Sequence, residues 1–214
     1  MAQIFSPRFV LALKLGALAA VLVSVAGIVA WRIGYAEPER GDAVEQVVPF
    51  SHQHHVGENG IDCRYCHANV ETGAFAGMPT LATCMGCHSQ LYTDAPLLAP
   101  LVAAFEQGRA FHWRRVHVLP DFVYFDHAPH VANGVGCETC HGRVDRMALV
   151  RRVRPLTMRA CLDCHRAPQR YLRPREREFA MGWQARDQDA LGKRLVRDYG
   201  IDTARLTDCS LCHR

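Results

Sequence analysis

The longest apolar stretch of the hydropathy pattern lies near the N-terminus. From Phe9 to Trp31 the only charged residue is Lys14, which stands near the start of the stretch. A helix rises about 1.5 Å per residue, so a helix over 9–31 is long enough to cross the hydrocarbon region of a bilayer. The Lys14 side chain can extend to the interface from that position. We therefore predict a transmembrane anchor over 9–31.

The basic residues on the N-terminal side of this stretch predict its orientation. Arg8 and Lys14 favour a cytoplasmic segment 1–8 and a C-terminal part on the outer, periplasmic side of a bacterial cytoplasmic membrane. The alternative is a cleaved signal peptide, with Gly34-Tyr35-Ala36 as a poor cleavage site. The apolar run is longer than the core of a usual signal peptide, so we expect a retained single-pass anchor.

The rest of the chain divides into a linker and one domain. Residues 32–46 are mostly polar with Pro38 and Gly41, and predict a linker, while 47–214 predict a single domain. Inside that domain, apolar residues at helical intervals between 97 and 105 predict an amphipathic packing helix. A second helix is predicted over 187–199, ended by Gly200.

Cysteine spacing indicates the chemistry of the domain. The sequence Cys-x-x-Cys-His occurs five times and uses all ten cysteines. In this motif two thiols add to the vinyl groups of a haem and the histidine binds the iron. On a helical turn the three side chains face the same way. The predicted attachment residues are Cys63, Cys66, Cys84, Cys87, Cys137, Cys140, Cys161, Cys164, Cys209 and Cys212, and the predicted proximal ligands are His67, His88, His141, His165 and His213.

Five covalent c-type haems predict the fold class. Disulfides or zinc sites are the alternatives for ten cysteines, but neither requires a histidine after each second cysteine. Flat apolar porphyrins would replace much of an ordinary side-chain core. We expect a mainly α and irregular multihaem cytochrome c domain, with short motif-bearing helices, a haem-dominated core and one N-terminal transmembrane helix.

The histidines outside the motifs are candidates for the second axial position. Phe-x-His-x-x-His occurs at 50–55 and again at 125–130, before the first and third motifs. This pattern is similar to that of small multihaem cytochromes of the c3 and c7 families. The resemblance implies that His52 serves haem one and His127 haem three, with His55 and His130 serving adjacent haems.

Five irons need five such ligands, and His117 is our fifth candidate. His54 and His112 are the remaining histidines, and Met147 or Met158 could replace one imidazole and raise the potential of its haem. Because histidines and methionines can fill every axial position, a multihaem reductase with an open iron is the less favoured class, and we expect no catalytic site in this chain alone.

Charge adds little. The formal net charge is +4, and haem propionates would lower it. Individual arginines among the central motifs could pair with propionates, although a general arginine bias is the better explanation of their number. No motif indicates nucleic-acid binding.

Larger segments resemble one family. The anchor, the motif Asp62-Cys63-Arg-Tyr-Cys66-His67, the segment from Pro79 to His88, the segment from Arg115 to His130 and Leu156-Thr-Met158 before Cys161 together are similar to the pentahaem subunit of alternative complex III. That resemblance implies as partners integral membrane quinol-oxidising subunits, an iron–sulfur subunit and a monohaem cytochrome c.

The function expected from these features is electron transfer through five haems, from a membrane quinol-oxidising complex to a periplasmic cytochrome c or a terminal oxidase. The membrane lipid is a further partner through the anchor. The alternative is a stand-alone membrane-anchored quinol dehydrogenase that feeds periplasmic reductases.

Overall fold

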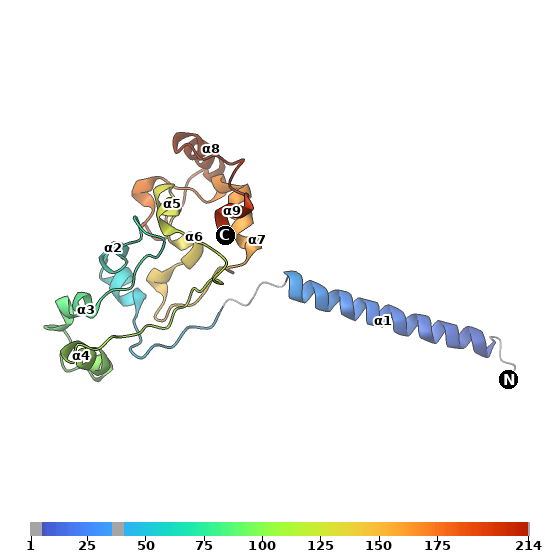
Figure 1. Ribbon diagram of the computed structural model, residues 1–214, viewed down its shortest axis with the longest axis horizontal. Coiled ribbons are helices and arrows are strands. Elements are labelled where there is room, and N and C mark those ends of the chain that lie inside the picture. The colour runs from blue at the N-terminus through green and yellow to red at the C-terminus, as the bar shows by residue number, and fades with distance from the viewer. Residues whose placement is uncertain (1–5, 36–40, 214) are drawn as a thin grey trace. The chain divides into compact units, whose positions relative to one another are not determined.

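The computed structural model describes residues 6–35 and 41–213 and divides into two compact units, Met1–Glu39 and Arg40–Arg214. The first unit holds helix α1 (Pro7–Tyr35) (Figure 1). Most of its large apolar side chains between Phe9 and Trp31 are exposed. Its segment Pro7–Arg32 is long and apolar enough to cross a membrane. The predicted anchor over 9–31 falls within α1. Most of the predicted segment 1–8 and part of the predicted linker lie outside the described residues.

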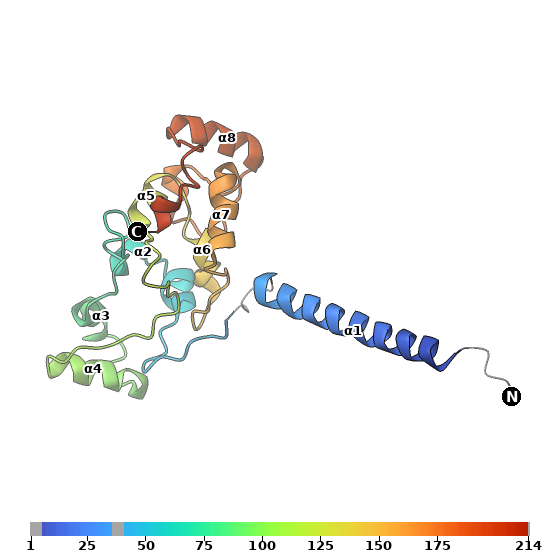
Figure 2. The same cartoon turned by 45° about the vertical axis from the view of Figure 1, so that its right-hand side comes forward.

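Short helices and long irregular connections make up the second unit (Figures 1 and 2). Its α-helices are α2 (Cys63–Cys66), α3 (Leu81–His88), α4 (Ala99–Glu106), α5 (His127–Ala132), α6 (Glu138–His141), α7 (Met158–Arg166), α8 (Gln188–Asp198) and α9 (Cys209–Cys212). A π-helical turn η1 (Gln53–Glu58) and the 3₁₀ turns η2 (Pro96–Leu98), η3 (Val144–Arg146), η4 (Pro168–Arg170) and η5 (Arg175–Arg177) complete it. Across 6–35 and 41–213 there is no β-strand, and Val135 and Leu172 form an isolated antiparallel bridge. The predicted fold class is confirmed.

Two helices arise where the apolar spacing predicts them. Helix α4, preceded by η2, covers the first predicted segment and buries Leu101 and Ala104. Helix α8 covers the second, and the Asp187 carboxylate caps it by accepting a hydrogen bond from the Ala190 N–H at 3.0 Å. Gly200 follows with a φ of 64°, a conformation that glycine adopts without strain.

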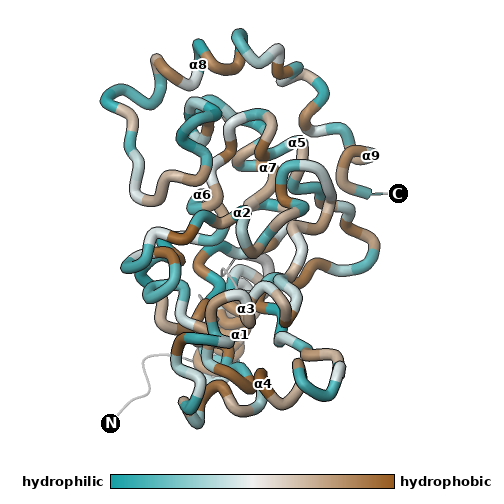
Figure 3. The backbone as a smooth tube through the Cα atoms, turned by 90° about the vertical axis from the view of Figure 1, so that its left-hand side faces the viewer, coloured by the Kyte–Doolittle hydropathy of each residue, from teal (hydrophilic) through white to brown (hydrophobic). Residues whose placement is uncertain are grey.

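Side chains alone form a small core. Within the described part of the second unit, the buried apolar residues are Val48, Val70, Leu101, Ala104, Val131, Leu172 and Leu195. Apolar and polar residues interchange over short distances along the backbone, with an apolar run at α4 (Figure 3). Such a domain needs a large apolar group besides its own side chains, and porphyrins fit that need.

Close backbone approach fixes α8 on η4. A Cβ on Gly192 of α8 would lie 1.8 Å from the Gln169 carbonyl oxygen, so glycine allows this contact. The Gln188 side-chain amide donates to the carbonyls of Gln169 at 3.0 Å and Leu172 at 2.7 Å. Close backbone packing and the two hydrogen bonds of Gln188 therefore hold α8 against η4, in the segment between motifs four and five.

Candidate haem-attachment sites

Each Cys-x-x-Cys-His motif lies on one helical turn. In α2, α6 and α9 the N–H of the motif histidine donates to the carbonyl of the first motif cysteine, at 2.8, 3.0 and 2.9 Å for His67, His141 and His213. A residue and its i+4 neighbour lie on the same helical face. The first thiol and the imidazole therefore point to one side, as attachment to a single porphyrin requires. All ten cysteines are free thiols.

N-capping side chains stabilise the start of three of these helices. The side chains of Asp62, Thr80 and Thr157 cap α2, α3 and α7 by accepting hydrogen bonds from the N–H groups of Arg64, Thr83 and Ala160. Helix α3 carries motif two and α7 carries motif four. A capped turn presents its cysteines and histidine in a fixed orientation, which covalent attachment at both thiols needs.

Backbone carbonyls orient four of the motif imidazoles. The Nδ1 atoms hydrogen-bond to the carbonyls of Gly77 for His67 (2.8 Å), Leu91 for His88 (3.1 Å), Leu206 for His165 (2.6 Å) and Phe122 for His213 (3.2 Å). An imidazole that donates from Nδ1 keeps Nε2 as the lone-pair nitrogen for a metal. These rings have the tautomer of an axial iron ligand.

The two Phe-x-His-x-x-His segments have nearly the same geometry. Phe50 meets His52 edge-on at 4.9 Å and stacks on His55 at 4.3 Å, measured between ring centroids. Phe125 meets His127 edge-on at 4.8 Å and stacks on His130 at 4.6 Å. In each segment the phenylalanine fixes the relative orientation of two imidazoles.

These distal imidazoles face motif imidazoles. The ring centroids are 6.5 Å apart for His52 and His67, 6.2 Å for His55 and His88, 6.3 Å for His127 and His141, and 6.1 Å for His130 and His165. An imidazole nitrogen binds a first-row metal at about 2 Å, so two rings on opposite sides of one iron have centroids about 6 Å apart. In each of these four pairs, the imidazole donors, the distance between the rings and the neighbouring motif cysteines fit a haem whose iron is bound by two histidines. The first and third pairs are also nearly parallel, at 7° and 8°.

Burial keeps two of these imidazoles uncharged. Burial, followed by repulsion from neighbouring histidines, lowers the pKa of His52 to about 4 and that of His141 to about 3. Both rings are therefore neutral at ordinary pH, which is the form that binds a metal.

The fifth proximal histidine has a different neighbour. The ring facing His213 is that of Phe122, at 6.0 Å between centroids. His117 lies against His141 instead, at 4.3 Å, and its Nε2 is buried without a hydrogen-bond partner. That distance is too short for an iron between the two rings. The assignment of His117 to a fifth iron stays a prediction.

The surroundings of the remaining histidine and methionine candidates do not identify an iron for any of them. His54 pairs with Glu58 at the surface, at 2.8 Å between Nδ1 and Oε2, and His112 is exposed. Met158 is 63% exposed at the start of α7, and the backbone carbonyl of Met147 accepts a hydrogen bond from the Gln53 N–H at 3.0 Å.

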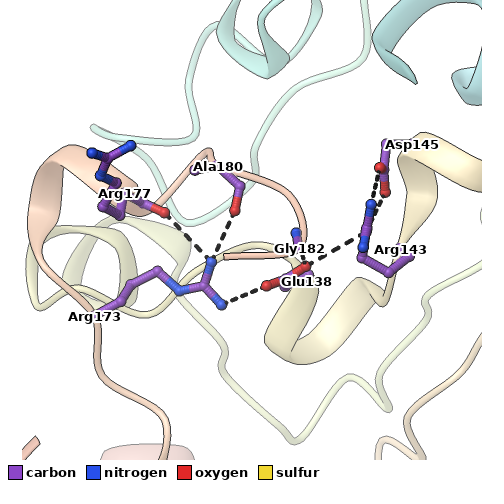
Figure 4. Close-up of polar contacts among 7 residues, drawn as sticks. All are labelled: Glu138, Arg143, Asp145, Arg173, Arg177, Ala180 and Gly182. Atoms are coloured by element: carbon purple, nitrogen blue, oxygen red, sulfur yellow. Dashed lines mark hydrogen bonds and ion pairs between the residues drawn. The ribbon is translucent and has the colours of Figure 1, made fainter. Parts of the chain in front are cut away.

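An ion-pair network around the third motif is a part of the site that sequence reasoning missed (Figure 4). Glu138, inside that motif, accepts hydrogen bonds from Arg173 at 2.8 Å and from the Gly182 N–H at 2.6 Å. Arg173 is almost fully buried and also donates to the carbonyls of Arg177 and Ala180. The network ties α6 to a segment 35 positions further along the chain, which no local pattern indicates.

Comparison with known proteins agrees with this geometry. Residues 123–214 match the family described as cytochrome c7 and related cytochrome c. A curated relative, the multiheme cytochrome c subunit of menaquinone reductase from Nitratidesulfovibrio vulgaris, is 40% identical over 98 residues. That match covers 45% of this chain and 46% of the relative, so the chain spans about half the length of the relative. Residues 123–214 are therefore cytochrome c7-like, and the motif geometry together with this relative indicates a multihaem c-type cytochrome.

Proposed function

We propose that this multihaem cytochrome is the electron-transfer subunit of a membrane-bound quinol-oxidising complex of the alternative complex III type. It would carry five covalent haems and pass electrons to a periplasmic cytochrome c or a terminal oxidase. The observation that carries the proposal is the set of four facing imidazole pairs, each with one histidine from an attachment motif. Iron with two imidazole ligands suits electron transfer, because no position is open to a substrate.

The chain's own residues do three things in this proposal. The thiols hold the porphyrins, the paired imidazoles bind the irons from both sides, and the carbonyls that accept from Nδ1 orient the rings and raise their basicity. The haems, when bound, supply one-electron redox chemistry. The close contacts between neighbouring sites keep the distance that an electron must cross short.

Two findings support a membrane partner. Helix α1 exposes an apolar surface long enough to span a bilayer, and the relative carries the name of a subunit of menaquinone reductase. We infer that α1 anchors the chain with its N-terminus in the cytoplasm and that unit Arg40–Arg214 faces the periplasm. Integral membrane subunits, an iron–sulfur subunit and a monohaem cytochrome c or an oxidase are the proposed partners.

The name of the relative favours a second candidate, in which electrons run in the opposite direction. In that case the same haem domain accepts electrons from a periplasmic donor and feeds a complex that reduces menaquinone. The contacts within the chain are the same in both cases, because a row of haems conducts either way.

Purification from membranes with a C-terminal tag tests these proposals. We expect integral membrane and iron–sulfur proteins in equal amounts with this chain, five haems per chain, and reduction of cytochrome c by added quinol. Reduction of quinone by a reduced periplasmic donor, without the quinol-driven reaction, would favour the second candidate. A chain that purifies alone and oxidises quinol would instead show the stand-alone dehydrogenase.

A paired variant provides the control. Replacing Cys209 and Cys212 by serine removes the fifth attachment site, and we expect one haem fewer per chain and impaired quinol-to-cytochrome turnover. His54→Ala, at an exposed histidine paired with Glu58, is expected to leave both values unchanged. Unchanged turnover in the cysteine variant would contradict an obligatory role for the fifth site.

A further inference from the structure

We infer that the five attachment motifs form a single row in the order two, one, three, four, five, which differs from their order along the chain. The row takes its meaning from the proposed function, but its order rests on contacts between residues of this chain. Motif-bearing helices α3 and α2 lie beside each other towards one end of the domain, and α6 and α7 lie beside each other further along it (Figures 1 and 2).

Motif two contacts motif one. The Cys66 thiol interacts electrostatically with the Cys84 thiol. A Cβ on Gly86, inside motif two, would lie 3.5 Å from the Tyr65 hydroxyl of motif one. On the distal side, Phe50 packs on both His52 and His55, whose rings face motifs one and two. The two sites therefore share contacts on both sides of their porphyrins.

Motif one also contacts motif three, through residues far apart in sequence. His127, which faces motif three, donates from Nδ1 to the carbonyl of Ala74 in the loop after motif one, at 2.8 Å. The Cys63 and Cys137 thiols also interact with each other. Since a thioether sulfur sits at a porphyrin edge, an interaction between these two sulfurs agrees with neighbouring porphyrin edges. Motif one takes part in both links and must lie between motifs two and three.

Motif three contacts motif four through Arg154. Its guanidinium group donates to the Thr139 carbonyl of motif three at 3.2 Å, and to the Ala160 carbonyl and the Cys164 sulfur of α7 at 3.1 and 3.2 Å. Phe125 packs on both distal rings of these two sites, as Phe50 does for the first two. This link repeats the geometry of the link between motifs two and one.

Motif five completes the row beside motif four. The Cys161 thiol interacts electrostatically with the Cys212 thiol. The Nδ1 atom of His165 hydrogen-bonds to the carbonyl of Leu206, just before motif five, at 2.6 Å. Motifs two and five are therefore the two ends, and motifs one and three form the central link.

The test uses the full chain in its membrane complex, with single distal histidines replaced by methionine. A methionine ligand raises the potential of its haem, so that site is reduced first and becomes diamagnetic. Electron paramagnetic resonance then follows the sites still oxidised, whose signals depend on coupling to oxidised neighbours. The variants His52→Met and His55→Met identify the signals of sites one and two by altering them.

The row predicts which signals change. In His127→Met, early reduction at site three is expected to change the signals of sites one and four and to leave sites two and five as they were. In His55→Met, early reduction at site two is expected to change site one alone. Neighbours in chain order would instead give a change at site two in the first variant and at site three in the second, and either result overturns the row.

Two controls keep the outcome decisive. His54→Ala is expected to give the parental spectrum. If a methionine variant fails to mature, an electron-density map of the wild-type complex with five traced irons decides the order, and an iron of motif one that is not between those of motifs two and three overturns the row. Quinol-to-cytochrome turnover of the same complex tests the proposed function separately, because an inactive complex can show the row and an active one can lack it.

Discussion

At the scale of single residues, one buried carboxyl group has no partner for one of its oxygens. Glu178 is 6% exposed, and its Oε1 has no hydrogen-bond partner. Burial raises the pKa of Glu178 from 4.5 to about 7, against the attraction of Arg175 and Arg64 and with repulsion from Glu71 and Glu176. Between pH 4.5 and about 7, Glu178 therefore keeps its proton in the folded chain and releases it in the unfolded chain.

This shift predicts a pH dependence of stability. Because the folded-state pKa is above the unfolded value, the free energy of unfolding falls as the pH rises from 4.5 to about 7 and is constant above that range, as far as Glu178 contributes. Glu178→Gln removes this pH-dependent loss of stability. The difference in free energy of unfolding between the variant and the parent should therefore grow in favour of the variant as the pH rises from 4.5 to about 7. Denaturant titrations at several pH values measure it, with the exposed Glu176→Gln as control; an advantage that is independent of pH would contradict the assignment.

The ion pair between Arg173 and Glu138 gives a second prediction at this scale. Arg173→Met leaves the carboxylate of Glu138 without its buried partner, and we expect a loss of about 3–5 kcal/mol in the free energy of unfolding. The exposed pair of Lys193 and Asp189 provides the control, since Lys193→Met should cost less than about 1 kcal/mol. Denaturation followed by haem absorbance compares the two, and similar losses would contradict a structural role for the network.

At the scale of elements, α8 depends on a glycine in its interior. Alanine usually stabilises a helix relative to glycine by about 1 kcal/mol, but a Cβ on Gly192 would meet the Gln169 carbonyl. We expect Gly192→Ala to destabilise the domain by about 1–3 kcal/mol. Thermal unfolding measures this change, with the exposed Arg194→Ala in the same helix as control. A stabilised Gly192→Ala would show that α8 does not pack closely on η4.

The elements also show how far a sequence can be interpreted. Period and capping residues predict α4 and α8, and the Cys-x-x-Cys-His spacing predicts the turns at the motifs, because these signals are local. The packing of Phe50 and Phe125 on their histidines is implied by the repeated Phe-x-His-x-x-His pattern. The pairing of Arg173 with Glu138 and the hydrogen bond of His127 to the Ala74 carbonyl join distant positions, and no periodicity encodes them. For His117, the count of irons suggested a ligand role, whereas the structure places its ring against His141.

At the scale of the whole molecule, helix α1 and the domain that carries the attachment motifs belong to separate compact units. A chain that begins at Arg40, exported behind a cleavable signal peptide, is therefore expected to attach its haems and to give the spectrum of the full-length protein, but not to sediment with membranes. Fractionation and the haem content per chain measure both properties. Loss of haem attachment would show that the domain needs α1 to fold, and continued sedimentation would show a second membrane contact.

The loop after motif one supplies carbonyls to two of the imidazoles proposed as iron ligands. Gly77 accepts from the Nδ1 atom of His67, assigned to the first site, and Ala74 accepts from that of His127, assigned to the third. The strength of such a hydrogen bond sets the electron density on the imidazole and hence the reduction potential of its iron. A movement of this loop would therefore act on the hydrogen bonds of both imidazoles, and so on the potentials of both proposed irons, at the same time.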